Sequence, residues 1–307
     1  MFIARYRIFL FWLAGLLTAG SIAAIVFLGL PLSIEFTGGS LVEVSYTEGR
    51  PELASIRERI EASGSFGDVV IRESGDAGVL LKTHTLSPEE HDALLAALSD
   101  NGAAPIVEQR FNSIGPSLGA ELAKKALWAL GAVILAIVLY IAWAFRRVSR
   151  PISSWVYGLI VVLILVHDVL VPAGFYAVWS FFTGAQVDSL FVVAILAILG
   201  YSVNDTIVIF DRVREKLARN DRENIAEPFE KVVGSSVMET LTRSINTSVT
   251  TSLALVALLI VGSPATFNFA LVLLAGVVVG TYSSILVAAP LLIPFAHAFA
   301  AKAPKNK

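Results

Sequence analysis

The sequence contains no cysteine and few charged residues, and each absence excludes a class of protein. Without cysteine there is no disulfide framework, no thiolate metal site and no cysteine nucleophile. Charged residues make up 16% of the chain, against about 25% in a typical soluble domain, and apolar residues make up 56%. A core of 307 residues cannot cover that much hydrocarbon without lipid. We therefore expect an α-helical membrane protein. The net charge of −2 gives no information about nucleic acid, and we expect no nucleic-acid partner.

Six apolar stretches are long enough to cross a bilayer, which takes about 20 residues each. They cover residues 8–30, 125–145, 152–175, 188–210, 244–262 and 267–296. The first follows Arg5 and Arg7, but it is too long for a cleavable signal peptide and no small-x-small site precedes Pro31. We interpret residues 1–30 as an uncleaved anchor helix and residues 125–296 as five further spans.

Lys and Arg are absent from two short loops, at about 176–187 and 263–266. Basic residues gather instead in four other segments: the N-terminus, residues 146–150, the loop 211–243 and the tail 297–307. Because basic loops stay in the cytoplasm, we expect a multi-pass protein of the cell inner (plasma) membrane with both termini cytoplasmic. Around Phe229 the loop 211–243 has an apolar pattern that predicts either an amphipathic helix at the membrane surface or a solvated connector.

The long segment 31–124 is expected outside the cytoplasm, and its pattern is that of a small folded domain. Its apolar periods predict four strands and two helices. In chain order these are a strand at 41–46, a helix at 51–62, strands at 69–71 and 79–82, a helix that begins at Ser87 and a strand at 106–111. The order β-α-β-β-α-β is that of a ferredoxin-like α+β domain. An irregular acidic loop is the alternative, since the segment carries 15 acidic and 6 basic residues up to position 123.

The fourth span contains a carboxylate, Asp205, between Asn204 and Thr206. Ionisable groups at membrane depth are costly and usually functional. Asp205 lies seven residues before Arg212, which is two helical turns or about 10 Å from the end of the span. A carboxylate there either takes up a proton or is kept ionised by a cation, and both states suit proton exchange. The alternative is a static buried pair that holds two helices together.

The fifth span opens with Arg243, which approaches the membrane from the same side as Asp205. Thr247 lies four residues further on and therefore on the same helix face. Polar side chains continue along this span at Ser244, Asn246, Ser248, Thr250, Thr251 and Ser252. We expect them either to order water in a cleft or to form hydrogen bonds between helices.

The third span contains His167 and Asp168, about seven residues from its predicted outer end. Either group could admit protons from outside, and Asp168 is equally consistent with a structural contact. The candidate residues for a proton relay are therefore Asp205, Arg243, Asn204, Thr247 and Asp168.

The sixth span carries small residues at four-residue spacing, at Gly276, Gly280 and Ser284. Such a face lets a second helix approach closely. These residues are candidates for packing against a partner helix, either within this chain or in another.

Five blocks of sequence resemble the SecF family of protein-export membrane proteins. They are residues 33–40, 111–119, 200–215, 240–248 and 280–284. The first reads Ser-Ile-Glu-Phe-Thr-Gly-Gly-Ser and resembles the family's hydrophobic-acid-Phe-Thr-Gly-Gly motif, with Glu35 where an aspartate is common. The third contains Asp205 and the fourth contains Arg243, so the likeness covers nearly the whole chain.

The resemblance implies a six-helix bundle like those of the RND superfamily, paired with SecD beside the SecYEG channel. It implies that the proton-motive force assists the export of preprotein chains, with Asp205 and Arg243 in proton movement. We expect no catalytic residue, no metal and no cofactor, and hence a translocation subunit rather than an enzyme.

Three other functions are consistent with parts of the sequence. Half of an RND-type exporter of small molecules would explain the spans, but such pumps usually carry larger outer domains. An intramembrane aspartyl protease would use Asp168 and Asp205, but it needs both at one depth and a Gly-x-Gly-Asp motif that is missing here. A structural scaffold would not require Asp205 and Arg243 in apolar spans.

Overall fold

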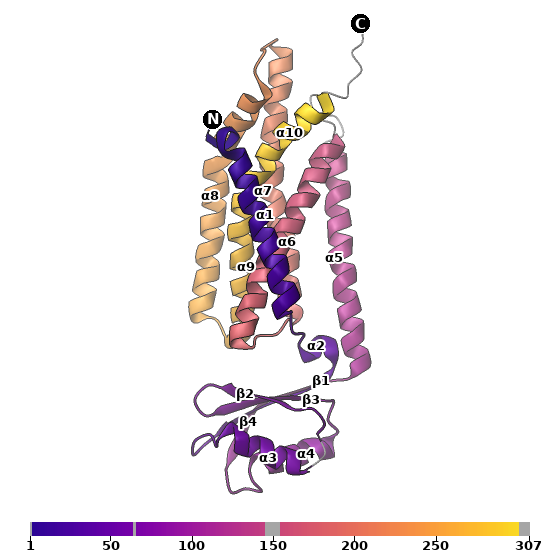
Figure 1. Ribbon diagram of the computed structural model, residues 1–307, viewed down its shortest axis with the longest axis vertical. Helices are drawn as coiled ribbons and strands as arrows, with labels where there is room; N and C mark the ends of the chain where they lie inside the picture. Colours follow the sequence, from indigo (N-terminus) through magenta and orange to yellow (C-terminus); the bar gives the residue numbers. More distant parts are fainter. Residues whose placement is uncertain (1, 64–65, 145–153, 301–307) are drawn as a thin grey trace. The chain divides into compact units, whose positions relative to one another are not determined.

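The computed structural model describes residues 2–63, 66–144 and 154–300, which belong to two compact units (Figure 1). One unit comprises Met1–Pro31 and Trp128–Lys307, and the other comprises Leu32–Leu127. The basic residues at 146–150 and the end of the tail, on which part of the predicted topology depends, lie outside the described residues.

Six helical segments of the described chain are long and apolar enough to cross a membrane, as the sequence predicts. The helices are α1 (Phe2–Leu28), α5 (Pro116–Ala144), α6 (Ser154–Thr183), α7 (Ser189–Arg222), α8 (Phe229–Val261) and α9 (Pro264–Ser283). Helix α9 continues through a π-helical turn, η1 (Ser284–Ala288), into α10 (Ala289–Ala300). Helices α6, α7 and α9 form the interior of this bundle, with α1 against α6 and α8 against α7 and α9. Large apolar side chains on the outer faces, such as Trp12, Trp128 and Trp155, are exposed, as lipid-facing residues are expected to be.

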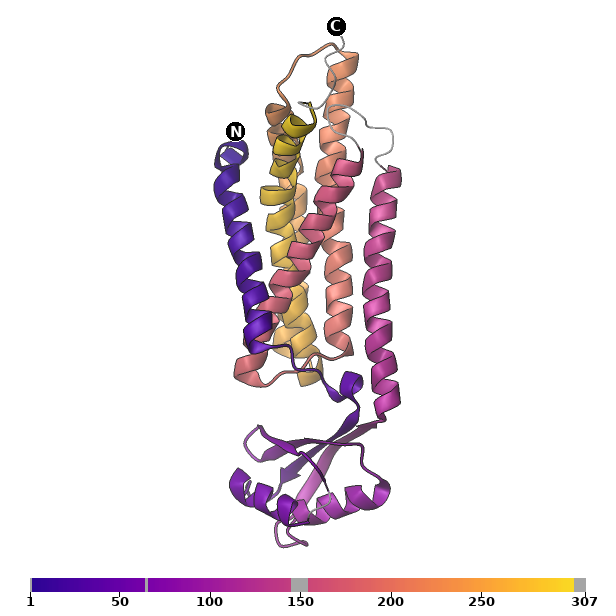
Figure 2. The same cartoon turned by 45° about the vertical axis from the view of Figure 1, so that its right-hand side comes forward.

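The unit Leu32–Leu127 contains the predicted ferredoxin-like fold. Its elements are α2 (Ile34–Thr37), β1 (Gly39–Tyr46), α3 (Leu53–Ser63), β2 (Val70–Ser74), β3 (Gly78–Thr83), α4 (Pro88–Leu98) and β4 (Ile106–Ile114). The strands form an antiparallel sheet in the order β2-β3-β1-β4, and α3 and α4 cover one face of it (Figure 2). Alternate residues of β1, including Val42 and Val44, point into the core with Leu81, Ile56 and Leu94. The predicted βαββαβ order is therefore confirmed.

The predicted start of the second domain helix is also confirmed. The Ser87 hydroxyl accepts a hydrogen bond from the Glu90 backbone at 3.2 Å, and the Glu90 carboxylate accepts one from the Ser87 backbone at 2.8 Å. This reciprocal capping box satisfies two amide donors that a helix start otherwise leaves open. The hydrogen bond from the Ser87 amide lowers the pKa of the Glu90 carboxyl.

The short helix α2 was not predicted, and it explains the two glycines that follow it. Gly38 and Gly39 have positive φ angles of 72° and 121°, which side chains rarely adopt. A Cβ atom on Gly38 would lie 2.7 Å from the Pro116 backbone, and one on Gly39 would lie 2.5 Å from the Thr83 carbonyl oxygen. Both positions therefore require glycine so that the chain can turn from α2 into β1.

The segment 211–243, predicted as a loop, is mostly helical. Helix α7 continues to Arg222 and α8 begins at Phe229, so only residues 223–228 connect them. Glu239 on α8 accepts from Arg212 Nε at 2.6 Å and forms an ion pair with Lys216 at 2.6 Å, which joins the two helices beyond their apolar parts. Of the two expectations around Phe229 the helix is correct, but its apolar side is buried in the bundle core at Val232, Val233 and Val237 rather than lying at a membrane surface.

Candidate functional site

Asp205 on α7 is a buried carboxylate that forms no ion pair with any residue the structure describes. Only 4% of the residue is exposed, and its Oδ2 atom has no hydrogen-bond partner among the described residues. Ser244 on α8 lies beside this carboxylate, and the Ser244 hydroxyl is also buried and has no hydrogen-bond partner among the described residues. An uncompensated buried charge is unfavourable, so this position favours a group that can bind a proton.

Arg243 does not form an ion pair with Asp205 in the part of the chain that the structure describes. Its side chain is exposed and borders a groove with Asp211, Arg212 and Glu239 at the end of the bundle. Asn204, the neighbour of Asp205, is exposed as well. The sequence places Asp205 and Arg243 on neighbouring helices, but the structure turns the carboxylate inward and the guanidinium outward.

The polar residues of α8 divide between two faces of the helix. Ser248 faces inward and receives hydrogen bonds from Tyr201 on α7 at 3.0 Å and from Thr281 on α9 at 2.6 Å. Thr247 faces outward, is exposed, and donates to the Arg243 carbonyl at 2.9 Å. The inward residues therefore hold three helices together, whereas the outward residues leave a polar strip on the surface of α8 that consists of Arg243, Asn246, Thr247 and Thr250.

The small residues of α9 pack within the chain. A Cβ atom on Gly276 would overlap Ile198 of α7, and one on Gly280 would lie 3.0 Å from the Ser202 Cβ atom. Ser284 shares a hydrogen bond of 2.9 Å with Thr206, also on α7. The helix that approaches this small-residue face is therefore α7 of the same chain.

Asp168 lies deeper in the bundle than predicted, and that prediction was wrong. The third span does not end near residue 175, because the apolar run continues past Pro172 and α6 reaches Thr183. Asp168 is fully buried, and its Oδ2 atom accepts from Ser202 on α7 and from Ser283 on α9, the latter at 2.8 Å. Ser202, Ser283 and Tyr282 were not predicted as site residues. The signal for Ser202 is its position three residues before Asp205, which places both on one helix face.

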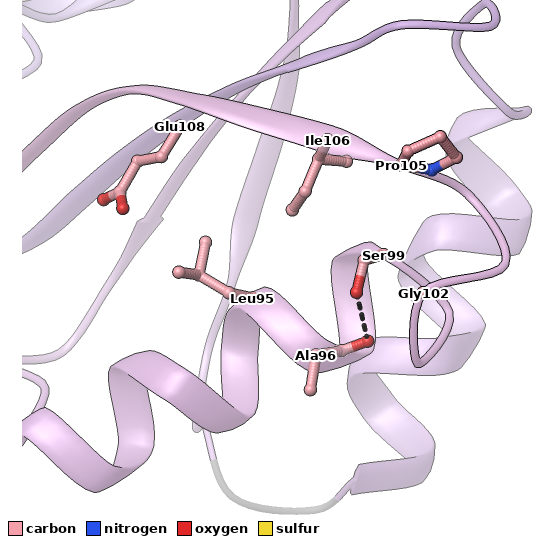
Figure 3. Close-up of a pocket in the computed structure, with 7 residues that line it drawn as sticks. All are labelled: Leu95, Ala96, Ser99, Gly102, Pro105, Ile106 and Glu108. Atoms are coloured by element: carbon pink, nitrogen blue, oxygen red, sulfur yellow. Dashed lines mark hydrogen bonds between the residues drawn. The ribbon is translucent and has the colours of Figure 1, made fainter.

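The ferredoxin-like domain contains a hollow, but its polar side chains are already paired. Figure 3 shows it between the end of α4 and the start of β4, lined by Leu95, Ala96, Ser99, Gly102, Pro105, Ile106 and Glu108. Its carboxylate, Glu108, is paired with His91 at 2.9 Å, and the Ser99 hydroxyl donates to the Ala96 carbonyl. Among the described residues no group of three His, Cys, Asp or Glu side chains could hold a metal ion. The bundle interior is therefore the candidate site.

A bundle of apolar helices with two buried carboxylates and an attached ferredoxin-like domain defines a polytopic membrane protein with a polar interior site. Family models identify its type: that of SecD/SecF protein export membrane proteins, C-terminal, matches residues 95–298, and that of the SecD/SecF GG motif matches residues 23–49. The chain belongs to the SecF family, which confirms the resemblance noted from its motifs.

Relatives named protein translocase subunit SecF match over most of the chain. The subunit from Anaerolinea thermophila is 35% identical over 94% of this chain and 91% of its own. The subunit from Sebaldella termitidis is 39% identical over 86% of this chain and 82% of its own length. The crystal structure of SecDF, a translocon-associated membrane protein from Thermus thermophilus, is 30% identical with a TM-score of 0.80. It covers 96% of this chain, but this chain spans only 38% of the SecDF chain.

Proposed function

We propose that this chain is an auxiliary subunit of the Sec protein translocase, which works with SecD to assist preprotein export and uses the proton-motive force. The observation that carries the proposal is Asp205, a buried carboxylate in the bundle of a SecF family member that has no ion-pair partner among the described residues. Each elementary charge that crosses the membrane gains about 2.3 kcal/mol per 100 mV. Proton binding at Asp205 would convert this energy into a change between two conformations, provided that they differ in proton affinity.

The partner proposal is supported by the polar strip on α8. Arg243 and Asn246 are exposed there, and lipid tails would offer their polar groups no hydrogen bonds. A SecD helix that covers the strip would satisfy them, and the complex would act beside SecYEG. In that arrangement Arg243 would influence the protonation of Asp205 when the helices move.

Export into sealed vesicles tests the proposed function directly. Vesicles that contain SecYEG, SecD and this chain should export more preprotein when a proton gradient is imposed, and the stimulation should disappear when this chain is left out. Since half of an RND-type exporter is the alternative, efflux of small dyes should be followed in the same vesicles. Gradient-driven dye efflux without any stimulation of preprotein export would contradict the proposal.

The proposed topology places the ferredoxin-like domain outside and the connection between α7 and α8 in the cytoplasm. Because the chain has no cysteine, a single introduced cysteine reports its own side without background. Asp76→Cys and Glu223→Cys change exposed residues on the two sides. We expect a membrane-impermeant maleimide to label them from opposite sides of sealed vesicles. If one side labels both variants, the topology is wrong.

A further inference from the structure

His167 and Asp168 face each other across a gap in the centre of the bundle. His167 Nδ1 lies 3.8 Å from Asp168 Oδ1, and neither atom has a hydrogen-bond partner among the described residues. The residues are 5% and 0% exposed. The other atoms of both groups are engaged: His167 Nε2 is 2.8 Å from the Tyr282 hydroxyl, and Asp168 Oδ2 accepts two serine hydroxyls. The imidazole Nδ1 and the carboxylate Oδ1 are therefore the two atoms of the pair that could bind a proton.

The charge of this pair depends on one proton. With a neutral imidazole and an ionised carboxylate the pair carries −1, and no Lys or Arg forms an ion pair with it in the described part of the chain. One added proton, on either Nδ1 or Oδ1, makes the pair neutral overall. Burying a net charge is costly, so the interior favours the loaded pair until a change in its surroundings releases the proton. A movement of less than 1 Å, or one bridging water, would close the gap for transfer between the two atoms.

The same carboxylate joins the three interior helices. Asp168 belongs to α6, Ser202 to α7 and Ser283 to α9, and the π-helical turn η1 begins at the next residue, Ser284. Single π-helical turns inside α-helices occur frequently at functional sites. A change of charge at Asp168 would alter both serine hydrogen bonds together, so it would change the contacts between all three helices at once.

Asp205 is close to this junction. Ser202 precedes Asp205 by three residues on α7, which corresponds to a rise of about 4.5 Å. The titratable side chains of the described residues that face Asp168 are His167 on α6 and Tyr282 on α9, with Asp205 one turn away on α7. A change of protonation at the pair can therefore affect the protonation of Asp205, and the reverse, over a single helical turn.

We propose that His167 and Asp168, with Tyr282 orienting the imidazole, form a second proton-binding site that takes up and releases one proton in step with Asp205. This inference deepens the proposed proton-driven function and rests on it for the role in export. The binding of the proton itself does not depend on export and has its own measurement.

Infrared difference spectroscopy on the purified chain in lipid vesicles tests the proton site. The carbonyl band of a protonated carboxylic acid should be present, should titrate as the pH rises, and should lose one component in Asp168→Asn. In His167→Gln that component should remain but titrate at a different pH, because the glutamine keeps a hydrogen-bonding group without the proton exchange. Asp211→Asn, an exposed change on α7, should leave the spectrum unaltered.

A purely structural Asp168 gives a different result. The amide oxygen of Asp168→Asn still accepts from Ser202 and Ser283, so the variant should fold while it loses the titrating component. If Asp168→Asn removes neither a carboxylic-acid band nor an imidazolium band, or if the band it removes never responds to pH or to His167→Gln, the site is not a proton-binding site. In the export assay Asp168→Asn should lose most of the gradient stimulation. Full stimulation in this variant overturns the inference alone, whereas a wild-type chain without stimulation overturns the proposed function.

Discussion

Asp205→Asn is expected to abolish the stimulation of preprotein export by a proton gradient while basal export continues. Asparagine has nearly the same size and still forms hydrogen bonds, but it cannot bind and release a proton. Since Asp205 is 4% exposed and its Oδ2 atom has no partner in the described chain, the substitution removes a charge without breaking an ion pair. Export into vesicles, measured with and without an imposed gradient, should give equal rates for the variant.

The matched control is Asp211→Asn on the same helix. Asp211 is exposed and lies 3.6 Å from Arg214, so its loss changes only a surface ion pair, which contributes about 0–1 kcal/mol. This variant should keep the full stimulation. Arg243→Ala should weaken stimulation as Asp205→Asn does if the arginine acts on the carboxylate through a moving interface. Undiminished stimulation in Asp205→Asn would make Asp205 a structural residue and place the proton path elsewhere.

The ferredoxin-like domain is predictable from the sequence because its signals are local. Alternation in β1 separates Val42 and Val44 from their outward neighbours, and the Ser87 capping box marks a helix start within four residues. The antiparallel order follows once these six elements are recognised. Helix α2 escapes prediction because four residues carry no period, and its position depends on the contact of Gly38 with Pro116.

The interior site is only partly predictable, since hydropathy does not locate helix ends or faces. Pro172 and Gly174 resemble the end of a span, yet α6 continues to Thr183, which moves Asp168 to within a turn of Asp205. The depth argument against an aspartyl protease therefore fails. The hydrogen bonds of Asp168 are the better argument against a protease. Its Oδ2 atom accepts from two serines, and no hydrogen bond joins Asp168 to Asp205 in the described chain.

Gly276→Leu is expected to destabilise the bundle more than any other single change in the small-residue face. A Cβ atom at this position would overlap the Ile198 side chain, which is fully buried. Overpacking of a dense core typically costs about 1–3 kcal/mol. Thermal unfolding of the purified chain in mild detergent should therefore show a lower midpoint, and the contact between α7 and α9 should loosen.

Gly276 is a better test than Gly280, because a change at Gly280 would also move Ser202 and hence the hydrogen bond to Asp168. Gly131→Leu on α5 is the control: no atom lies within 4 Å of a Cβ atom there, so its unfolding midpoint should equal that of the wild type. The unfolding midpoint reports stability and co-purification with SecD reports partner binding, and both can be measured on the same samples. If Gly276→Leu unfolds like the wild type but no longer co-purifies with SecD, the small-residue face packs against the partner and not against α7. A lowered midpoint for the isolated chain assigns the face to α7.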